Sequence, residues 1–211
     1  MIIKQKILWK VLKVNCDNIG IQKAITSIDQ GGIIIFPTDT VYGIGCNPYN
    51  KEAVKKIYKL KSRNISKPFP VLVYSKEIAE QIVFFDKISK KIAERFWPGP
   101  LTLILRLTDK QLKKSLNINE KIALRIPDNK CTLELLKKCN FLVGTSANIS
   151  NQTPCKDPEE CFRNIKNFDI FIDGGIITSK GESTIIEVEN NEIKIIREGA
   201  LTKEEILKFW I

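Results

Sequence analysis

The stretch GGIIIFPTDTVYGIG, residues Gly31–Gly45, carries the clearest fold signal in the sequence. Residues 33–36 form an unbroken apolar run between a glycine and a proline, which predicts a short strand buried on both faces. The chain becomes polar directly after Pro37. Ligands of open α/β sheets bind beyond the carboxyl ends of strands, so this loop is either a ligand-binding loop or an ordinary turn. Gly43 and Gly45 are expected to give it backbone freedom and to let a ligand approach.

Length and composition predict a folded protein of one domain. The 211 residues have ordinary apolar and charged fractions, so we expect a single domain over residues 1–211 with its motifs between about 20 and 205. No apolar stretch reaches the length of a membrane span, and the N-terminus lacks a continuous signal-peptide core. We therefore expect a cytoplasmic protein with no membrane partner.

The formal net charge is +10, which raises the question of a polyanionic partner. The lysines are spread over predicted helix faces, as at Lys55, Lys56 and Lys59, and no basic arm or tail is present. Because electrostatic steering needs clustered charge, a solvated surface is favoured over a dedicated nucleic-acid face.

Cysteine and histidine usage limits the chemistry. None of the six cysteines forms a Cys-x-x-Cys pair and the chain contains no histidine, so free, reduced, structural thiols are expected rather than a zinc site. A general base must then be a carboxylate, a lysine, a tyrosine, water or the substrate. The cysteines are Cys16, Cys46, Cys131, Cys139, Cys155 and Cys161.

The rest of the chain alternates between apolar runs and helical periods. Helices are predicted after caps at Asp17 or Asn18, Asn50, Ser75, Asp86 and Asp128, near 159–165, and from Thr202. Strands are predicted at 7–14, 33–36, 70–74, 101–107, 121–126, 141–144 and up to Asp173, followed by a hairpin of 183–188 with 192–197. This order predicts the α/β class, with an open, twisted, mixed sheet and helices packed on it.

The segment KSRNISKP, residues 61–68, is the most basic loop of the sequence. If it is extended, Lys61 and Arg63 point to the same side, and Lys67 could converge on the same anion. The loop is therefore either a phosphate site without a P-loop motif or a solvated surface loop.

Seven motifs now identify a resemblance. The chain resembles the YrdC-like domain family and, within it, the threonylcarbamoyl-AMP synthases. The motifs occur in family order over nearly the whole chain, and seven together are far more specific than any one. They are PTDTVYGIG (37–45), KSR with the later KP (61–68), WPGPLT (97–102), LRIPDN (124–129), TSANIS (145–150), STII (183–186) and REGA (197–200).

The resemblance implies a twisted α/β sheet with a basic concave face, and an activity. That activity condenses L-threonine, bicarbonate and ATP to threonylcarbamoyl-AMP and pyrophosphate, for the N6-threonylcarbamoyladenosine modification of tRNA. Mg²⁺ is expected to accompany ATP, and downstream threonylcarbamoyl-transfer proteins are the implied recipients of the product.

The resemblance also implies roles for individual residues. The catalytic signature residues are Lys61, Arg63, Ser146 and Asn148. The ATP-binding residues are Arg63, Lys67, Ser146, Asn148 and Arg197. The threonine-binding residues are Thr40, Tyr42, Arg125 and Ser183. Asp39 and Asp173 are candidate metal contacts, although an aspartate in a turn usually has a structural role.

Three residues depart from the family pattern and bear on fine contacts. Asn64 and Glu198 stand where prolines are usual, and Leu72 where some longer relatives have a histidine. Two alternative functions stay open at this point. One is a module that binds double-stranded RNA or tRNA through the basic face, and the other is a YciO-type paralogue, which generally lacks the Ser-x-Asn signature found here at 146–148.

Overall fold

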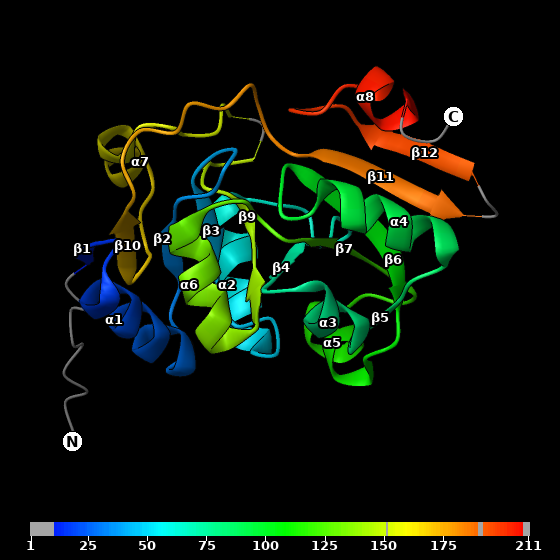
Figure 1. Ribbon diagram of the computed structural model, residues 1–211. Coiled ribbons are helices and arrows are strands. Elements are labelled where there is room, and N and C mark those ends of the chain that lie inside the picture. Colours follow the sequence, from blue (N-terminus) through cyan, green and yellow to red (C-terminus); the bar gives the residue numbers. More distant parts are fainter. Residues whose placement is uncertain (1–10, 151, 190–191, 209–211) are drawn as a thin grey trace.

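The computed structural model describes residues 11–150, 152–189 and 192–208, whose strands form two mixed sheets lying side by side (Figure 1). The predicted mixed α/β class is confirmed. The strands divide between a five-stranded and a seven-stranded sheet instead of forming the one sheet expected.

The five-stranded sheet carries the central strand β2. β2 pairs in parallel with β10 and antiparallel with β3, and β10 in turn pairs in parallel with β1. The order across the sheet is β1 (Leu12–Asn15), β10 (Ile170–Asp173), β2 (Ile34–Phe36), β3 (Gly43–Gly45) and β9 (Thr145–Ser146).

Both faces of β2 are covered, as the apolar run predicts. Ile34 and Phe36 pack in a cluster with residues of α1 (Asn18–Asp29) and α6 (Lys130–Cys139). Ile35 faces the other way, into a cluster that includes residues of α2 (Lys51–Lys61) and α7 (Pro158–Asn164). Alternate residues of a strand point to opposite faces, so an unbroken apolar run suits a strand covered on both sides.

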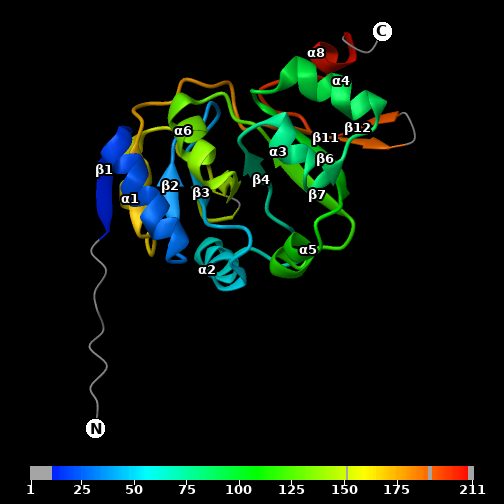
Figure 2. The same cartoon turned by 60° about the horizontal axis from the view of Figure 1, so that its bottom comes forward.

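The seven-stranded sheet forms the other half of the molecule (Figures 1 and 2). Its order is β12 (Glu192–Arg197), β11 (Thr184–Glu189), β6 (Leu101–Leu107), β7 (Lys121–Arg125), β4 (Val71–Val73) and β8 (Phe141–Val143), with β5 (Val83–Phe84) also paired to β6. The helices of this half are α3 (Lys76–Glu80), α4 (Lys87–Phe96), α5 (Lys110–Leu116) and α8 (Lys203–Lys208). The β11–β12 hairpin confirms the predicted pairing.

Strand direction in this sheet determines which residues meet at one edge. β6 and β11 run parallel, while β7 is antiparallel to β6 and β12 is antiparallel to β11. The last residues of β7 and β12 therefore lie at the same end of the strands as the first residues of β6 and β11.

Helix caps explain most of the helix starts. The carboxylate of Asp17 accepts a hydrogen bond from the Gly20 amide at 2.8 Å, which confirms the predicted start of α1. The predicted cap at Asp128 is wrong by one residue. Asn129 caps α6 by accepting from the Thr132 amide at 3.1 Å. Aspartate and asparagine cap helices about equally well, so residue type alone could not decide between positions 128 and 129.

The expectation that Gly43 and Gly45 provide loop freedom is wrong. Both are in the strand β3, and in the described part of the chain the glycines with positive φ are Gly31 and Gly175. A Cβ on Gly45 would stand 1.9 Å from the Val143 carbonyl oxygen, and one on Gly43 would stand 2.9 Å from the Phe36 ring. Close packing, rather than flexibility, requires glycine here.

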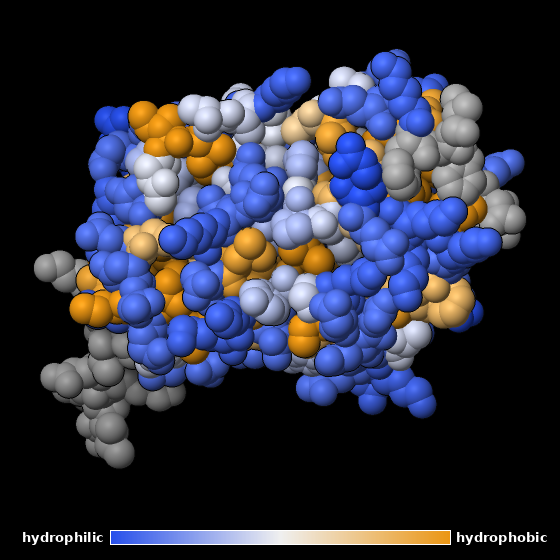
Figure 3. All heavy atoms as spheres, in the orientation of Figure 1, coloured by the Kyte–Doolittle hydropathy of each residue, from blue (hydrophilic) through white to orange (hydrophobic). Residues whose placement is uncertain are grey.

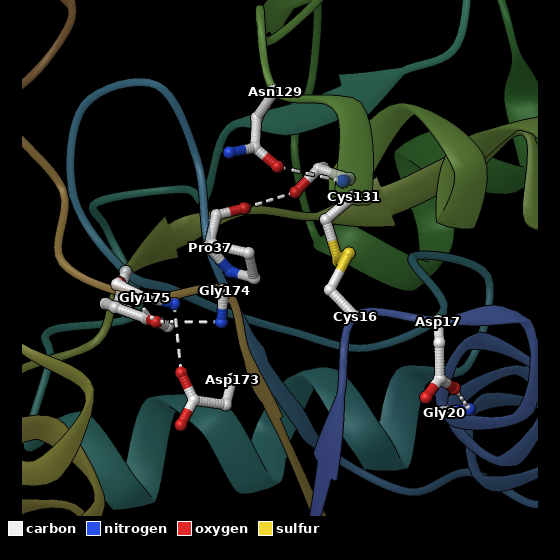
Figure 4. Close-up of a disulfide and its surroundings, with 11 residues drawn as sticks. Cys16, Asp17, Gly20, Pro37, Asn129, Cys131, Asp173, Gly174 and Gly175 are labelled. Carbon is white, nitrogen blue, oxygen red and sulfur yellow. Dashed lines mark hydrogen bonds between the residues drawn. A yellow bond between two sulfur atoms is a disulfide. The ribbon is translucent and has the colours of Figure 1, made fainter.

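The expectation that all six cysteines are free is also wrong. Cys16 and Cys131 form a disulfide with a Cα–Cα distance of 5.8 Å, and it joins the end of β1 to the first turn of α6 (Figure 4). The neighbouring Thr132 hydroxyl donates to the Pro37 carbonyl. The two cysteines are 115 residues apart, so their spacing in the sequence carries no sign of the bond. Cys46, Cys139, Cys155 and Cys161 are free.

Two further expectations concern the ends and the surface of the chain. Of the strand predicted at 7–14, residues 7–10 lie outside the described residues, and β1 spans Leu12–Asn15. Within the described ranges, every helix is too short or too polar to cross a membrane.

The face shown in Figure 3 is largely hydrophilic, with apolar side chains in small separate groups.

The disulfide predicts a thiol count and a stability change. Protein purified without reductant should show four reactive thiols in denaturant and six after reduction. The bond closes a loop of 115 residues, so its reduction should destabilise the fold by about 4–5 kcal/mol in the chain-entropy model. A melting temperature that is unchanged by reductant, together with six thiols before reduction, would contradict the bond.

The packing of β3 predicts that Gly45→Ala destabilises the protein. The added methyl group meets a backbone carbonyl that cannot move alone, so we expect a loss of about 1–3 kcal/mol in urea unfolding. Gly181→Ala is the matched control, because a Cβ there meets no atom within 4 Å, and its effect should stay within about 0.5 kcal/mol. Equal stabilities for the two variants would refute this account of Gly45.

Candidate active site

A pocket lies where the two sheets approach one another, and both sheets line it. The Thr38–Val41 loop and β3 contribute from the five-stranded sheet. The strand ends where β6 and β11 begin and β7 and β12 finish contribute from the seven-stranded sheet. Its lining includes three arginines, one carboxylate and several hydroxyls. These polar residues are Thr38, Arg63, Thr102, Arg125, Thr145, Ser146, Glu182, Ser183 and Arg197.

Arg125, the last residue of β7, reaches across to the loop that follows β2. Its Nη2 lies 2.5 Å from Oδ1 of Asp39, and its Nη1 donates to the Thr40 hydroxyl at 2.9 Å. Its Nε donates to the Gly99 carbonyl at 2.9 Å. Burial lowers the pKa of Arg125, and the carboxylate of Asp39 opposes that shift. The result is a buried, oriented cation at the pocket wall.

The loop after β2 is held by its own hydroxyls. The Thr38 hydroxyl donates to the Val41 carbonyl at 2.6 Å and accepts from the Thr40 amide at 3.1 Å and the Val41 amide at 3.2 Å. The two threonine hydroxyls are 3.0 Å apart. The predicted threonine-binding residue Thr40 contacts Arg125 but does not itself line the pocket.

Arg197, the last residue of β12, is held by the residues that precede β11. Its Nη2 donates to the Ser183 carbonyl at 2.8 Å and lies 3.3 Å from the Ser183 hydroxyl. Its Nη1 lies 2.9 Å from Oε2 of Glu182. The Ser183 hydroxyl also lies 2.9 Å from the hydroxyl of Thr102 on β6. The edge of the seven-stranded sheet thus brings together two of the predicted site residues, Ser183 and Arg197.

Arg63 enters the pocket from the loop after α2. Its Nε donates to the Lys67 carbonyl at 2.9 Å and its Nη2 to the Pro68 carbonyl at 3.3 Å, while its guanidinium carbon lies 5.2 Å from the centre of the Phe69 ring. Burial lowers the pKa of Arg63. The KP pair of the motif therefore orients Arg63 through backbone oxygens. The Lys67 side chain is exposed and is not among the residues that line the pocket, so its contact with ATP stays a prediction.

Lys61 is buried rather than aimed at an anion in the pocket. Its ammonium donates to the carbonyls of Ser146 and Asn148, the latter at 2.7 Å, and to the Asn148 side-chain oxygen at 3.0 Å. The side chain is 1% exposed, and burial lowers its pKa to about 8. All three N–H bonds are used, so Lys61 holds the 146–148 loop in place and is a positioning residue.

Two other predicted site residues support the loops behind the pocket. The Tyr42 hydroxyl donates to the Gly175 carbonyl at 2.8 Å and accepts from the Gly174 amide at 3.1 Å, and burial raises its pKa to about 12. Asn148 accepts from Lys61 and donates to the Gln152 carbonyl. Of the Ser-x-Asn pair, Ser146 alone lines the pocket.

The sequence reasoning missed Thr102 and Glu182. Thr102 is the last residue of the WPGPLT motif and Glu182 directly precedes the STII motif, so these positions within and next to the motifs were the available signal. Leu72, one of the departures, forms part of the pocket wall and packs against Gly144, where a Cβ would stand 2.4 Å from its Cγ.

Both candidate metal contacts are engaged in ion pairs, although Oδ2 of Asp39 is buried without a hydrogen-bond partner in the described part of the chain. Asp39 pairs with Arg125, and Asp173 lies 3.0 Å from the Lys13 ammonium and accepts from the Gly175 amide at 2.9 Å (Figure 4). Across residues 11–150, 152–189 and 192–208, no three His, Cys, Asp or Glu side chains are grouped so that they could hold a metal ion.

The pocket is chemically suited to a ligand with several negative charges. Arg63, Arg125 and Arg197 place three guanidinium groups at the pocket, and guanidinium is the side-chain cation best suited to binding a carboxylate or a phosphate. Hydroxyls from both sheets surround them, and no nucleophile–base pair is among the lining residues of the described chain.

Comparison with known proteins gives consistent matches. The sequence model of the Sua5/YciO/YrdC family, described as "Telomere recombination", matches residues 26–199. The chain is 36% identical over 174 residues to the threonylcarbamoyl-AMP synthase of Buchnera aphidicola, covering 76% of this chain and 94% of the relative. It is 31% identical over 190 residues to the threonylcarbamoyl-AMP synthase of Bacillus subtilis, covering 88% of this chain and 55% of the relative.

Solved structures agree in fold. The crystal structure of P. abyssi Sua5 complexed with L-threonine matches with a TM-score of 0.86 and 30% identity, covering 94% of this chain and 61% of that one. E. coli YciO matches with a TM-score of 0.82, but at 23% identity the likeness shows the fold alone. The chain thus spans about six-tenths of the P. abyssi protein.

The burial of Lys61 predicts a pH-dependent stability. Lysine has an ordinary pKa of 10.5 and that of Lys61 is about 8, so between these values the unfolded chain binds one more proton than the folded one. Stability should therefore rise with pH across this window. Lys61→Met removes this titration, so the stability of the natural protein relative to the variant should be larger at pH 9.5 than at pH 7.5 in urea unfolding. A pH-independent difference would show that the ammonium is not desolvated.

Proposed function

The chain belongs to the Sua5/YciO/YrdC family, and from this premise we propose that it is a threonylcarbamoyl-AMP synthase. The proposed reaction condenses L-threonine, bicarbonate and ATP to threonylcarbamoyl-AMP and pyrophosphate. The single observation that carries the proposal is the convergence of Arg63, Arg125 and Arg197 with the hydroxyls of Ser146 and Ser183 in one pocket between the sheets.

The geometry supports a division of labour among the three arginines. Arg125 is fixed by Asp39 and Gly99 beside the Thr40 loop, so its role in the proposal is to bind the threonine carboxylate together with Ser183. Arg63 lines the same pocket from the loop after α2, and its role in the proposal is to bind ATP phosphates. Arg197 lies beside Ser183, where it can contact both ligands.

The proposed chemistry needs no covalent enzyme intermediate. The threonine amine attacks bicarbonate and forms a carbamate with loss of one water molecule, and a carbamate oxygen then attacks the α-phosphorus of ATP. A new P–O bond forms while the bond to pyrophosphate breaks. The chain contributes by holding the reactants together and by placing guanidinium charge near the phosphates as negative charge develops. This suits a chain without histidine.

Mg²⁺ enters the proposal with ATP rather than as a resident ion. Magnesium usually keeps several waters and binds through substrate phosphates with one or two carboxylates. Glu182 is the carboxylate among the lining residues, and it is paired with Arg197. We therefore propose that the phosphates and water supply most of the ligands. Bound Mg²⁺ would neutralise phosphate charge during pyrophosphate release.

The proposal also names partners and a location. The product is consumed by downstream proteins that transfer the threonylcarbamoyl group to adenosine in tRNA, and the basic surface could meet RNA at that stage. ATP and tRNA are cytoplasmic, so we propose that location. RNA binding without synthase activity is the competing function, and the assay below distinguishes the two.

The experiment measures pyrophosphate release from ATP. Release should require both threonine and bicarbonate, and Arg63→Ala should lower kcat/KM by about ten- to hundred-fold. Such a loss is expected because a hydrogen bond to a charged group contributes about 1.5–3 kcal/mol. Arg163→Ala on α7 is the matched control. Arg163 is exposed and its Nε donates to the Glu159 carbonyl, so that variant should retain normal activity.

Two results would contradict the proposal. Equal activity of Arg63→Ala and the natural protein, at equal melting temperatures, would remove the phosphate role of Arg63. Pyrophosphate release that no amino acid stimulates, with tight binding of duplex RNA at physiological salt, would favour the RNA-binding function instead.

A further inference from the structure

Glu182 is an acidic residue in a pocket that is otherwise built to attract anions. Among the described residues that line the pocket, it is the one carboxylate beside three arginines. Burial lowers the pKa of Lys61, Arg63 and Arg125, and the negative charge of Glu182 partly opposes that lowering, so its field reaches the other cations of the site. Neither the motifs nor the proposed reaction assigns it a role.

Glu182 occupies a donor of Arg197 that a substrate anion would need. Its Oε2 lies 2.9 Å from Nη1 of Arg197, while Nε and Nη2 of the same guanidinium donate to the Ser183 carbonyl at 3.2 and 2.8 Å. A phosphate or carboxylate binds arginine best through two parallel N–H bonds. With Nε and Nη2 committed to Ser183, Nη1 is the nitrogen left to bind an anion, and Glu182 already accepts a hydrogen bond from it.

The Glu182 side chain can move while its backbone stays in place. Its carbonyl accepts from the Ala200 amide at 2.8 Å, and the Thr184 amide donates to the Pro100 carbonyl at 2.9 Å, so the segment entering β11 is anchored. The ion pair itself is partly exposed, with 38% of the Arg197 side chain and 34% of the Glu182 side chain accessible. Pairs of this kind stabilise proteins by only about 0.2–1 kcal/mol and are readily broken.

We propose that Glu182 is a specificity-determining residue that competes with the anionic group of the substrate for Arg197 and so lowers the affinity of the pocket for anions. The identity of that group, a phosphate of ATP or the carboxylate of threonine, rests on the proposed function. An anion that binds Arg197 more strongly than Glu182 does displaces it, and other anions bind more weakly than they would without Glu182.

The test uses inorganic pyrophosphate as the probe, with binding measured by calorimetry at fixed ionic strength. Glu182→Gln keeps the size of the side chain and removes its charge, so pyrophosphate should bind about two- to five-fold more tightly, the equivalent of a partly exposed ion pair. Glu189→Gln is the matched control. Glu189 is on β11 and its replacement changes the net charge of the protein by the same amount. Its partner Lys121 would still pair with Glu187 at 2.7 Å, and neither Lys121 nor Glu189 lines the pocket.

Kinetics then identify the competing group. A lower KM for ATP in Glu182→Gln assigns the competition to a phosphate, and a lower KM for threonine assigns it to the carboxylate. Tighter pyrophosphate binding without any threonine-dependent turnover would support the role of Glu182 while refuting the proposed function.

Other outcomes overturn the role of Glu182. Pyrophosphate affinity that is unchanged, weaker, or raised equally by Glu189→Gln would refute the competition. A large loss of kcat at unchanged affinity would also refute it, because the carboxylate would then be accepting a proton in the reaction instead. The melting temperature of each variant verifies that the fold is retained.

Discussion

The buried contact of Arg125 with Asp39 and Thr40 is the constraint on which the site depends, because it ties the two sheets together at the pocket. Arg125 belongs to β7 of one sheet, and its partners belong to the loop after β2 of the other. A buried ion pair costs desolvation energy, and removing one partner leaves an uncompensated charge. Such a pair is therefore better explained by the orientation it imposes than by the stability it adds. It holds one guanidinium at the junction where the substrates of the proposed reaction would meet.

A second buried cation, Lys61, supports the part of the pocket wall that Ser146 forms. Lys61 ends α2, and its three hydrogen bonds to Ser146 and Asn148 hold the loop that follows β9. Carbonyl oxygens rather than carboxylates surround this ammonium, so it supplies geometry at the expense of a lowered pKa. The Lys-x-Arg motif thus divides its work, with the lysine shaping the loop and Arg63 presented to the pocket. Ser62, with a φ of 50°, turns the chain between these two residues, so that Lys61 faces the 146–148 loop while Arg63 enters the pocket.

The disulfide and the glycines of β3 show how packing limits the chain around this site. The Cys16–Cys131 bond fixes the start of α6 near the Pro37 carbonyl, where the Thr132 hydroxyl also binds. Gly45 lets β3 approach the Val143 carbonyl closely enough for the pocket wall to form. These contacts tie the loop after β2 to α6 and hold β3 against the last residue of β8. The positions of the functional hydroxyls follow from this framework rather than from the local sequence of each loop.

The sequence alone determined the features that depend on near neighbours. The apolar run of β2, the caps at Asp17 and Asn50, the hairpin of β11 and β12, and the motif loops could all be predicted, because periodicity and capping act over a few residues. Only the tertiary structure decided which motif residues face the pocket. It buried Lys61, left Lys67 exposed, brought Glu182 beside Arg197 and joined Cys16 to Cys131. The reason is physical: each of these outcomes depends on strand direction and sheet packing between segments far apart in the chain, which no local pattern encodes.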